Sequence, residues 1–388
     1  MRIAHTSDWH AGRIWKNIQR IDELAAVLDH LARFLESEKA DLLLVSGDVF
    51  DSGAPSAEAE RLVFEFLKRT GQAGTRSVVV AGNHDHPARL DAWGTLAELV
   101  GVRVVGLPRR AEKGGVIRLT TRSGESATVA ALPFAPAHRL VSALELARDE
   151  TLAKQRYADG FRRMVEALSA EFRADTVNLL VCHTHLEGAV FSGSERQVHL
   201  GDEWAAAPQA LPHRAHYVAL GHIHRPQRVP GAPAHAEYAG SPLQLDFGEE
   251  GEAKSFVWIE ASPGVPARVE RIPYEGGKEL ETVRTTLEDL PNIADRARAD
   301  RWLRVVLSLP GRIPDASRRV RELLPNALVV QVELPEEERE ETEPVRRDAR
   351  PDALYREYFR KAHGHEPPAE LVEAFASLYE GELSEETS

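Results

Sequence analysis

Short apolar runs alternate with amphipathic stretches along the first 275 residues of the chain. Apolar residues spaced by three and four positions over 21–35 predict a helix with one buried face, and the apolar run directly after it, 41–45, predicts a buried strand. The alternation continues, with helices expected from Pro55-Ser56 and over 90–100, and strands over 77–80, 102–106, 128–132, 177–182, 216–220 and 255–260. This pattern is typical of an α/β domain.

The pattern changes at Gly276-Gly277-Lys278. Beyond this point the sequence predicts a strand (302–309), a helix (315–324) and another strand (327–334), which is enough for a small α/β module. The acidic stretch that follows cannot bury itself and predicts a solvated linker, with two short helices after it, near 351–362 and 368–380. We therefore expect a main α/β domain, a small α/β domain, an acidic linker and a helical tail, at residues 1–275, 276–335, 336–350 and 351–388.

The length of 388 residues suits two or three domains, and the composition, 43% hydrophobic and 28% charged, is that of a globular protein. The formal net charge of −13 at first argues against a nucleic-acid partner. Residues 336–388, however, hold sixteen Asp/Glu and seven Lys/Arg, so this tail carries −9 of the charge and residues 1–335 only −4. The charge of the whole chain therefore neither excludes a DNA substrate nor proves one.

A single cysteine, Cys182, excludes an internal disulfide framework and fits a reducing compartment. No apolar stretch is long enough to span a bilayer, and strand-like residues begin at position 2, which leaves no room for a signal peptide. We expect a soluble, cytoplasmic protein with no membrane partner, in which Cys182 is a small buried apolar residue.

Five of the expected strands end in polar residues of the same chemical kind. These strand ends carry the sequences Asp8-Trp9-His10, Gly47-Asp48-Val49-Phe50-Asp51, Gly82-Asn83-His84-Asp85, His183-Thr184-His185 and Gly221-His222-Ile223-His224. Ligand sites in open α/β sheets lie beyond the carboxyl ends of the strands, so the five ends can converge. Each motif alone is weak, because Gly-Asp turns and His-x-His pairs are common, but five in this order indicate one site.

The side chains at these strand ends form the donor set of a transition-metal site. The set comprises Asp8, His10, Asp48, Asn83, His183, His222 and His224. Seven ligands are too many for one ion and suit two ions that share a bridge, for which the Asp48 carboxylate is the natural candidate. The imidazole-rich mixture favours Mn²⁺, Fe²⁺ or Zn²⁺ over Mg²⁺ or Ca²⁺. Such a cluster keeps a positive charge, attracts a phosphate ester and supports in-line displacement at phosphorus.

His84 lies next to the ligand Asn83 and is not needed as a ligand itself. We expect His84 to protonate or stabilise the leaving oxygen, with Asp51 orienting it, as in other acid–base pairs. Three further histidines near the cluster are interpreted as structural residues or as supports of the ligands: His5, His86 and His185.

The ordered motifs resemble the signature of the calcineurin-type metallophosphoesterases, Asp-x-His, Gly-Asp-x-x-Asp, Gly-Asn-His-Asp, His and Gly-His-x-His, over roughly residues 1–275. Longer stretches are similar to the SbcD family, the nuclease subunits of bacterial SbcC–SbcD complexes. These stretches are His5-Thr6-Ser7-Asp8-Trp9-His10-Ala11-Gly12-Arg13, Gly47-Asp48-Val49-Phe50-Asp51-Ser52-Gly53-Ala54-Pro55-Ser56 and Tyr238-Ala239-Gly240-Ser241-Pro242. Ala11 stands where Leu is usual, while Asp51, where archaeal and eukaryotic relatives often carry His, fits the bacterial branch.

The resemblance implies a metallophosphoesterase β-sandwich flanked by helices (α-β-β-α), a small α/β capping domain that binds DNA, and a helical tail that binds an ATPase. It implies a nuclease with two Mn²⁺ ions and with double-strand exonuclease and single-strand or hairpin endonuclease activity, acting in DNA repair, recombination and replication. It also implies an SbcC-type coiled-coil ATPase as partner and a homodimer formed through helices near 56–70 and 89–100. In the alternative, the residues of those helices, Leu62, Phe66, Trp93 and Ala97, pack only on their own sheet.

Basic residues flank the predicted metal loops and are candidates for phosphate contacts or, equally, for solvated surface charges: Arg13, Lys16, Arg20, Arg89, Arg196 and Arg225. Apolar faces are expected on the two tail helices, from Leu354, Tyr358 and Phe359 and from Leu371, Phe375, Leu378 and Tyr379. Docking of these faces on a partner's coiled coil is favoured over folding back on the body.

Two other functions stay open at this point. A phosphatase or nucleotidase acting on small phosphomonoesters would keep the metals but has no use for the small domain and the tail. A non-catalytic scaffold would retain the metals for stability, although the intact ligand set argues against it.

Overall fold

The computed structural model describes residues 1–122, 124–136, 150–195, 205–296, 300–311 and 313–335, and in the tail 354–356, 358–360, 366–372 and 374–375. The chain divides into two compact units, one comprising Met1–Leu307 and Asp315–Gln331, the other Ser308–Pro314 and Val332–Ser388.

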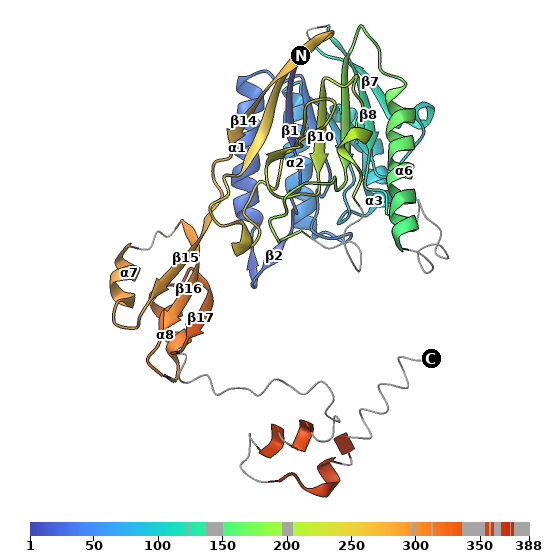
Figure 1. The fold of residues 1–388 in the computed structure, drawn as a ribbon. Coiled ribbons are helices and arrows are strands. Elements are labelled where there is room, and N and C mark those ends of the chain that lie inside the picture. Colours follow the sequence, from blue (N-terminus) through green and yellow to red (C-terminus); the bar gives the residue numbers. More distant parts are fainter. Residues whose placement is uncertain are drawn as a thin grey trace. The chain divides into compact units, whose positions relative to one another are not determined.

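Two six-stranded sheets form the core of the first unit (Figure 1). The first sheet has the order β14-β13-β1-β4-β5-β6 and contains β1 (Arg2–Thr6), β4 (Leu42–Val45), β5 (Arg76–Val80), β6 (Val102–Val105), β13 (Ser255–Ser262) and β14 (Val265–Pro273). The second has the order β11-β12-β10-β9-β8-β7 and contains β7 (Val116–Thr120), β8 (Ser126–Leu132), β9 (Val177–His183), β10 (Tyr217–Gly221), β11 (Gln227–Arg228) and β12 (Ala236–Tyr238). The central strands of each sheet are parallel, and antiparallel strands close the edges at β13, β14, β7 and β11.

Three apolar cores separate the layers. Between the sheets, Leu44 and Val80 of the first sheet pack in one cluster with Val129 and Leu179 of the second. A second cluster fills the space between the first sheet and three helices, and a third packs one helix against the second sheet. These outer helices are α1 (Ile21–Ser37), α2 (Ala57–Gln72) and α3 (Pro87–Ala97) on the first sheet and α6 (Glu150–Ser169) on the second. The expected α-β-β-α sandwich is confirmed.

The hydrophobic spacing explains why the first helices form where they do. The predicted stripe of α1 is buried, from Leu24 to Leu35, because residues three and four apart share one helix face. α2 begins after Ser56, whose Oγ accepts a hydrogen bond from the N–H of Ala59 (3.2 Å) and so satisfies a free helix amide. The smaller elements are the β2 (Ile14–Trp15) and β3 (Ile18–Gln19) hairpin and the 3₁₀ helices η1 (Glu98–Val100), η2 (Ala111–Lys113), η3 (Pro208–Ala210) and η4 (Phe247–Glu249).

A three-stranded sheet follows the sandwich, in the order β15-β16-β17. Its elements are β15 (Glu279–Thr285), α7 (Leu290–Arg296), β16 (Arg301–Ser308), α8 (Ala316–Leu323) and β17 (Ala327–Glu333). The strands and the helix expected after residue 300 are therefore present. β15 was missed by the sequence reasoning because Leu280 and Val283 are its only large apolar residues and do not alternate with period two. The boundary at 275/276 stays a prediction.

The tail is described in four short pieces, and the predicted acidic linker, 336–350, lies outside the described residues, as do Leu378 and Tyr379. Within the tail, the ring of Tyr355 stacks on that of Phe375, with centroids 4.5 Å apart. Tyr358 and Leu371 are exposed, so these two apolar side chains are not buried within this unit. Among the described residues, no helix combines the length and the hydropathy that crossing a bilayer requires.

Candidate metal centre

The five polar strand ends meet at one edge of the sandwich. They follow β1, β4 and β5 of the first sheet and β9 and β10 of the second. Main-chain hydrogen bonds join the first two loops, because the N–H groups of Asp8 and His10 donate to the carbonyl oxygens of Gly47 and Asp48 (both 3.0 Å). Across the sandwich, Nδ1 of His183 donates to the carbonyl of Ser46 (2.8 Å). The sheets therefore bring these loops together, as parallel strands do with their carboxyl ends.

The backbone of this edge is strained at four of the predicted ligands. Asp8, His10, Asp48 and His222 have φ values of 51°, 46°, 47° and 103°, a region that residues with a side chain rarely occupy. The loop after β5 needs a glycine at position 82, because a Cβ at Gly82 would clash with the Asp48 carboxylate. Strain of this kind persists only where the surroundings impose it, and it gathers at functional sites.

One half of the site contains Asp8, His10 and His224, whose ligand atoms all lie within 4.8 Å of one another. The Nε2 atoms of His10 and His224 are 3.1 Å apart, so both rings aim at the same point. All three side chains are buried. Asp8 also accepts the main-chain N–H of His222 at both carboxylate oxygens (3.1 and 3.2 Å).

The other half contains Asn83, His183 and His222. The Oδ1 atom of Asn83 lies 2.9 Å from Nε2 of His183 and 2.9 Å from Nδ1 of His222. Asp48 lies between the two halves, because its Oδ2 is 3.5 Å from Nε2 of His183 and 3.9 Å from Nε2 of His10. The structure thus brings all seven predicted ligands together, with the Asp48 carboxylate shared by both halves.

The protonation states of the clustered side chains favour the binding of cations. Burial, with the nearby charge of Asp48, raises the pKa of Asp8 well above its usual value. Burial lowers the pKa of His10 to about 4 and also lowers that of His222, so both imidazoles are neutral, the form that binds metal. Although burial opposes it, the main-chain N–H of His84, which donates to Oδ1 of Asp48, helps to lower the pKa of that carboxyl. Buried carboxylates and neutral imidazoles facing one another suit a dinuclear divalent centre.

His84 is half-buried at the rim of this cluster. Its main-chain N–H donates to Oδ1 of Asp48 (2.8 Å), and its Nδ1–H donates to the carbonyl oxygen of Asp51 (2.8 Å). The Asp51 carboxylate has other neighbours, with Oδ1 lying 3.2 Å from Nδ1 of His10 and 3.4 Å from Nη1 of Arg13. The expected contact is therefore corrected: the main chain of Asp51, not its carboxylate, orients His84, while the carboxylate faces the ligand His10.

Asp85 is a buried residue of the site to which the sequence reasoning gave no role. Its carboxylate accepts three main-chain N–H groups, from Gly82 (2.8 Å), Phe50 (2.9 Å) and Val49 (3.2 Å). Burial and then the charge of Asp48 raise the pKa of Asp85 to about 7. The residue ties the loop of Asn83 to the loop of Asp48, and its place at the end of the Gly-Asn-His-Asp motif was the available clue.

The three neighbouring histidines have structural partners. His5 lies between the hydroxyls of Tyr217 (2.9 Å) and Ser46 (2.7 Å). His86 caps α3, and the ring of His185 packs edge-on against that of Phe191. Cys182 is buried in the core between the second sheet and α6, as expected.

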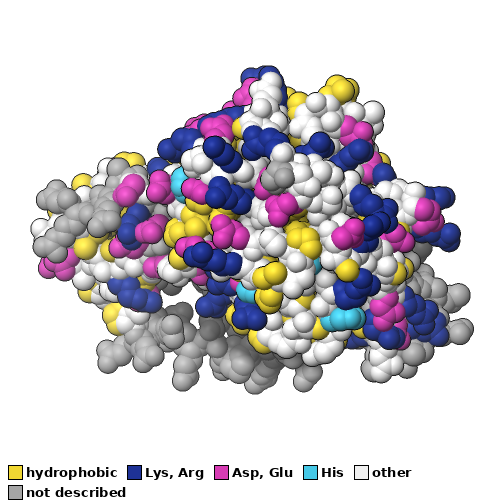
Figure 2. Space-filling model, turned by 90° about the horizontal axis from the view of Figure 1, so that it is seen from above, with side chains coloured by type: hydrophobic (Ala, Val, Ile, Leu, Met, Phe, Trp, Pro, Cys, Tyr) yellow, Lys and Arg dark blue, Asp and Glu magenta, His cyan; other side chains and the backbone are white. Residues whose placement is uncertain are grey.

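The basic residues near the loops differ in what they can contact. Arg20 is buried and binds both carboxylate oxygens of Glu23 (3.0 and 2.7 Å), so it is neither a surface charge nor a phosphate contact. Lys16 is exposed, Arg89 and Arg225 pair with Glu60 and Glu252, and Arg196 lies outside the described residues. Figure 2 shows a face on which Lys and Arg are interspersed with Asp and Glu, without a continuous basic patch.

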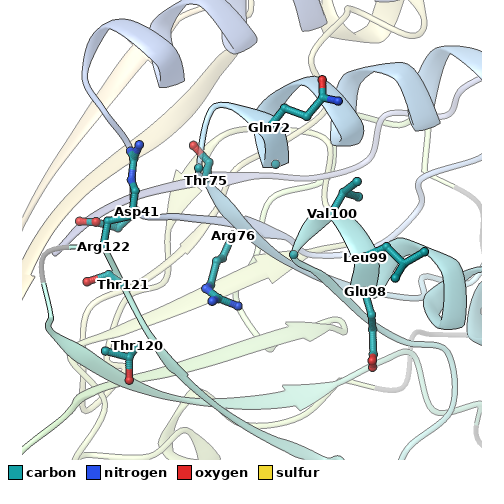
Figure 3. Close-up of a pocket in the computed structure, with 13 residues that line it drawn as sticks. Asp41, Gln72, Thr75, Arg76, Glu98, Leu99, Val100, Thr120, Thr121 and Arg122 are labelled. Carbon is teal, nitrogen blue, oxygen red and sulfur yellow. The ribbon is translucent and has the colours of Figure 1, made fainter.

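A cavity of about 500 Å³ lies at the opposite edge of the first sheet (Figure 3). Asp41, Arg76 and Gly101 line it, and these residues stand at the amino ends of β4, β5 and β6. None of the seven predicted ligands lines this cavity. It is therefore separate from the metal centre.

Comparisons with known proteins agree with this geometry. Residues 1–226 match the calcineurin-like phosphoesterase family, and residues 265–362 match a family described as the type 5 capsule protein repressor C-terminal domain. The chain is 33% identical to the D subunit of the SbcCD nuclease of Bacillus subtilis, over 98% of each chain. It is 32% identical to the protein of that name from Rhodobacter capsulatus (77% of this chain and 78% of that one) and 30% identical to the one from Escherichia coli K12 (89% and 87%).

The fold and the site define a calcineurin-like phosphoesterase. Within this class, the chain belongs to the family of the SbcCD nuclease D subunits.

Proposed function

We propose that this protein is a metal-dependent phosphodiesterase that cleaves DNA. The observation that carries the proposal is the convergence of seven metal donors from five strand ends on one buried cluster, with Asp48 between its halves. The relatives named as nuclease subunits, which are 30–33% identical over 77–98% of the chain, support DNA rather than a small phosphomonoester as the substrate.

The residues divide into metal holders and a proton donor. Asp8, His10 and His224 would hold one cation and Asn83, His183 and His222 the other, with Asp48 shared. Two bound divalent cations supply positive charge to a phosphate and make water a stronger acid. We propose Mn²⁺ as the metal, because the site mixes imidazoles with hard oxygen donors.

His84 is the proposed proton donor to the leaving oxygen. Its Nδ1–H is engaged by the carbonyl of Asp51, which leaves Nε2 as the atom that can carry a proton to substrate. The half-buried position of His84 gives it access to a bound phosphodiester at the rim of the cluster.

We further propose double-strand exonuclease and single-strand or hairpin endonuclease activity, in DNA repair, recombination and replication, together with an SbcC-type coiled-coil ATPase. The relatives are named as one component of an SbcCD nuclease, which supports such a partner. In the proposed arrangement, residues 1–275 are the nuclease domain, 276–335 cap the DNA, and the tail beyond the 336–350 linker binds the ATPase. The exposed Tyr358 and Leu371 support a docking role for the tail.

A homodimer through α2 and α3 is also proposed. Val63 and Phe66 are buried in the core beneath these helices. Leu62, Trp93 and Ala97 are partly buried against the same core, so packing on the chain's own sheet accounts for part of the apolar surface of the two helices. By contrast, Phe64 of α2, Leu96 of α3 and Leu99 of the adjoining η1 are 37%, 72% and 84% exposed. Large apolar side chains exposed on these elements support a self-contact.

The test compares substrates with the full chain and Mn²⁺. We expect cleavage of a DNA hairpin and of linear duplex ends, with at most weak release of phosphate from mononucleotides. Activity confined to mononucleotides would contradict the nuclease proposal and favour the phosphatase. The same assay with Asp48→Ala excludes a contaminating nuclease.

A further inference from the structure

We propose that Glu249 is a positioning residue that acts through Ser194 to fix the ring of the metal ligand His224. The inference rests on the proposed metal centre. Glu249 is the last residue of η4 and lies far from the five motifs in the sequence, so the sequence reasoning gave it no role.

A chain of hydrogen bonds runs from Glu249 to the ring. The hydroxyl of Ser194 donates to Oε1 of Glu249, and its oxygen lies 2.6 Å from Nδ1 of His224. Because the carboxylate accepts the hydroxyl proton, the Ser194 oxygen is left to accept Nδ1–H of His224. This arrangement selects the tautomer with its lone pair on Nε2, the atom that faces His10 across 3.1 Å.

The Glu249 carboxylate is itself held in place. Its Oε2 accepts the N–H of Leu245 (3.0 Å) and pairs with Nζ of Lys254 (2.6 Å). The same ammonium donates to the main-chain carbonyl of His224 (2.9 Å). On the other side, the main-chain N–H of His224 donates to Oε1 of Glu195 (3.0 Å). Contacts from two segments thus fix the ring and both main-chain groups of this ligand.

Burial argues that these groups are not placed for stability alone. The Glu249 side chain is fully buried and that of Lys254 is 6% exposed. Burying two charges carries a desolvation cost that their attraction often fails to recover, so apolar residues would serve a purely structural role as well. Glu249 contacts Ser194, the partner of His224, and Lys254 contacts the main chain of His224 itself. Positioning this metal ligand would explain why the buried ion pair is present.

The other half of the centre is built differently, which makes the inference specific. There, Nδ1 of His183 is fixed by the main-chain carbonyl of Ser46 (2.8 Å), which no side-chain substitution removes. Loss of Glu249 should therefore weaken the cation held by His224 and spare the one held by His183. A general defect in folding would weaken both.

The experiment is calorimetric titration of the metal-free full chain with Mn²⁺, together with its thermal unfolding midpoint. We expect two binding events in the wild type, of which Ser194→Ala and Glu249→Gln weaken one by about 10- to 100-fold and leave the other within about threefold. Because Ser194 and Glu249 both lie near Nδ1 of His224, at 2.6 and 3.5 Å, the effects of the two variants should not add. Ser194→Thr keeps the hydroxyl and should bind nearly as the wild type does.

Glu237→Gln is the matched control, since Glu237 is also buried and ion-paired, with His235 (2.7 Å) and Arg271 (2.8 Å), and touches none of the seven ligands. Unchanged binding in both Ser194→Ala and Glu249→Gln would overturn the inference. So would equal weakening of both events with a lower unfolding midpoint, the mark of a structural role. A wild type that binds fewer than two Mn²⁺ would instead contradict the proposed function itself.

Discussion

Two buried aspartates, one at each end of the parallel strand β4, lie in different surroundings. Asp48, after the strand, lies among imidazoles from both sheets, in a loop with positive φ. Asp41, before the strand, accepts the N–H of Arg2 (2.9 Å) and borders a cavity of about 500 Å³ (Figure 3). Among the described residues, the clusters of possible metal ligands lie at the carboxyl end of the strand, and none of their members lines the cavity. Converging side chains and backbone strain, rather than empty volume, therefore mark the candidate site of this fold.

Asp48→Ala should have the largest effect. It removes the carboxylate shared by both halves, so we expect loss of at least one Mn²⁺ equivalent and a fall of about 10³-fold or more in DNA cleavage. Calorimetric titration gives the number of bound Mn²⁺ ions, and a hairpin assay gives the cleavage rate. Asp41→Ala, at the other end of the strand, should cost about 1–3 kcal/mol of stability and keep both metals. Retention of two Mn²⁺ equivalents by Asp48→Ala would show that Asp48 is not the bridge.

His84→Ala should separate chemistry from metal binding. The variant loses the proposed proton donor but none of the seven ligands, so cleavage should fall by about 10²- to 10⁴-fold while both Mn²⁺ equivalents remain. Single-turnover kinetics measure the cleavage rate, and calorimetry on the same preparation measures the number of bound Mn²⁺ ions. Normal cleavage by the variant would remove His84 from the catalytic set.

Gly82→Ala should produce a smaller effect by steric means. The added Cβ would collide with the Asp48 carboxylate, so overpacking should lower the free energy of unfolding by about 1–3 kcal/mol and weaken Mn²⁺ binding. Gly124→Ala is the comparison, because nothing lies within 4 Å of its new Cβ. That variant should keep wild-type metal affinity, and equal metal loss in the two would mean that crowding at Asp48 is unimportant.

Arg76→Ala, in the cavity at the amino end of β5, should have the smallest effect. Arg76 is exposed and lies at the edge opposite the ligands, so cleavage should stay within about twofold and stability within about 0.5 kcal/mol. A strong loss of activity would show that the two edges are functionally coupled.

The sequence alone was enough to propose the seven ligands, because each stands at or just beyond the end of a buried apolar strand and parallel strands end at one edge. It could not place Glu249, Ser194 and Lys254, since they meet His224 only through the folded loops after β9 and β12. The same reason hid the burial of Arg20, whose partner Glu23 and main-chain contact at Gln244 depend on tertiary packing. The orientation of the Asp51 carboxylate was equally out of reach, because side-chain direction in a loop is not fixed by spacing.

Anomalous diffraction from crystals of the full chain grown with Mn²⁺ tests the central claim most directly. The account predicts two manganese peaks within the cluster, one beside Asp8, His10 and His224, the other beside Asn83, His183 and His222, with the Asp48 carboxylate contacting both. A single peak, or two peaks away from these side chains, would contradict it.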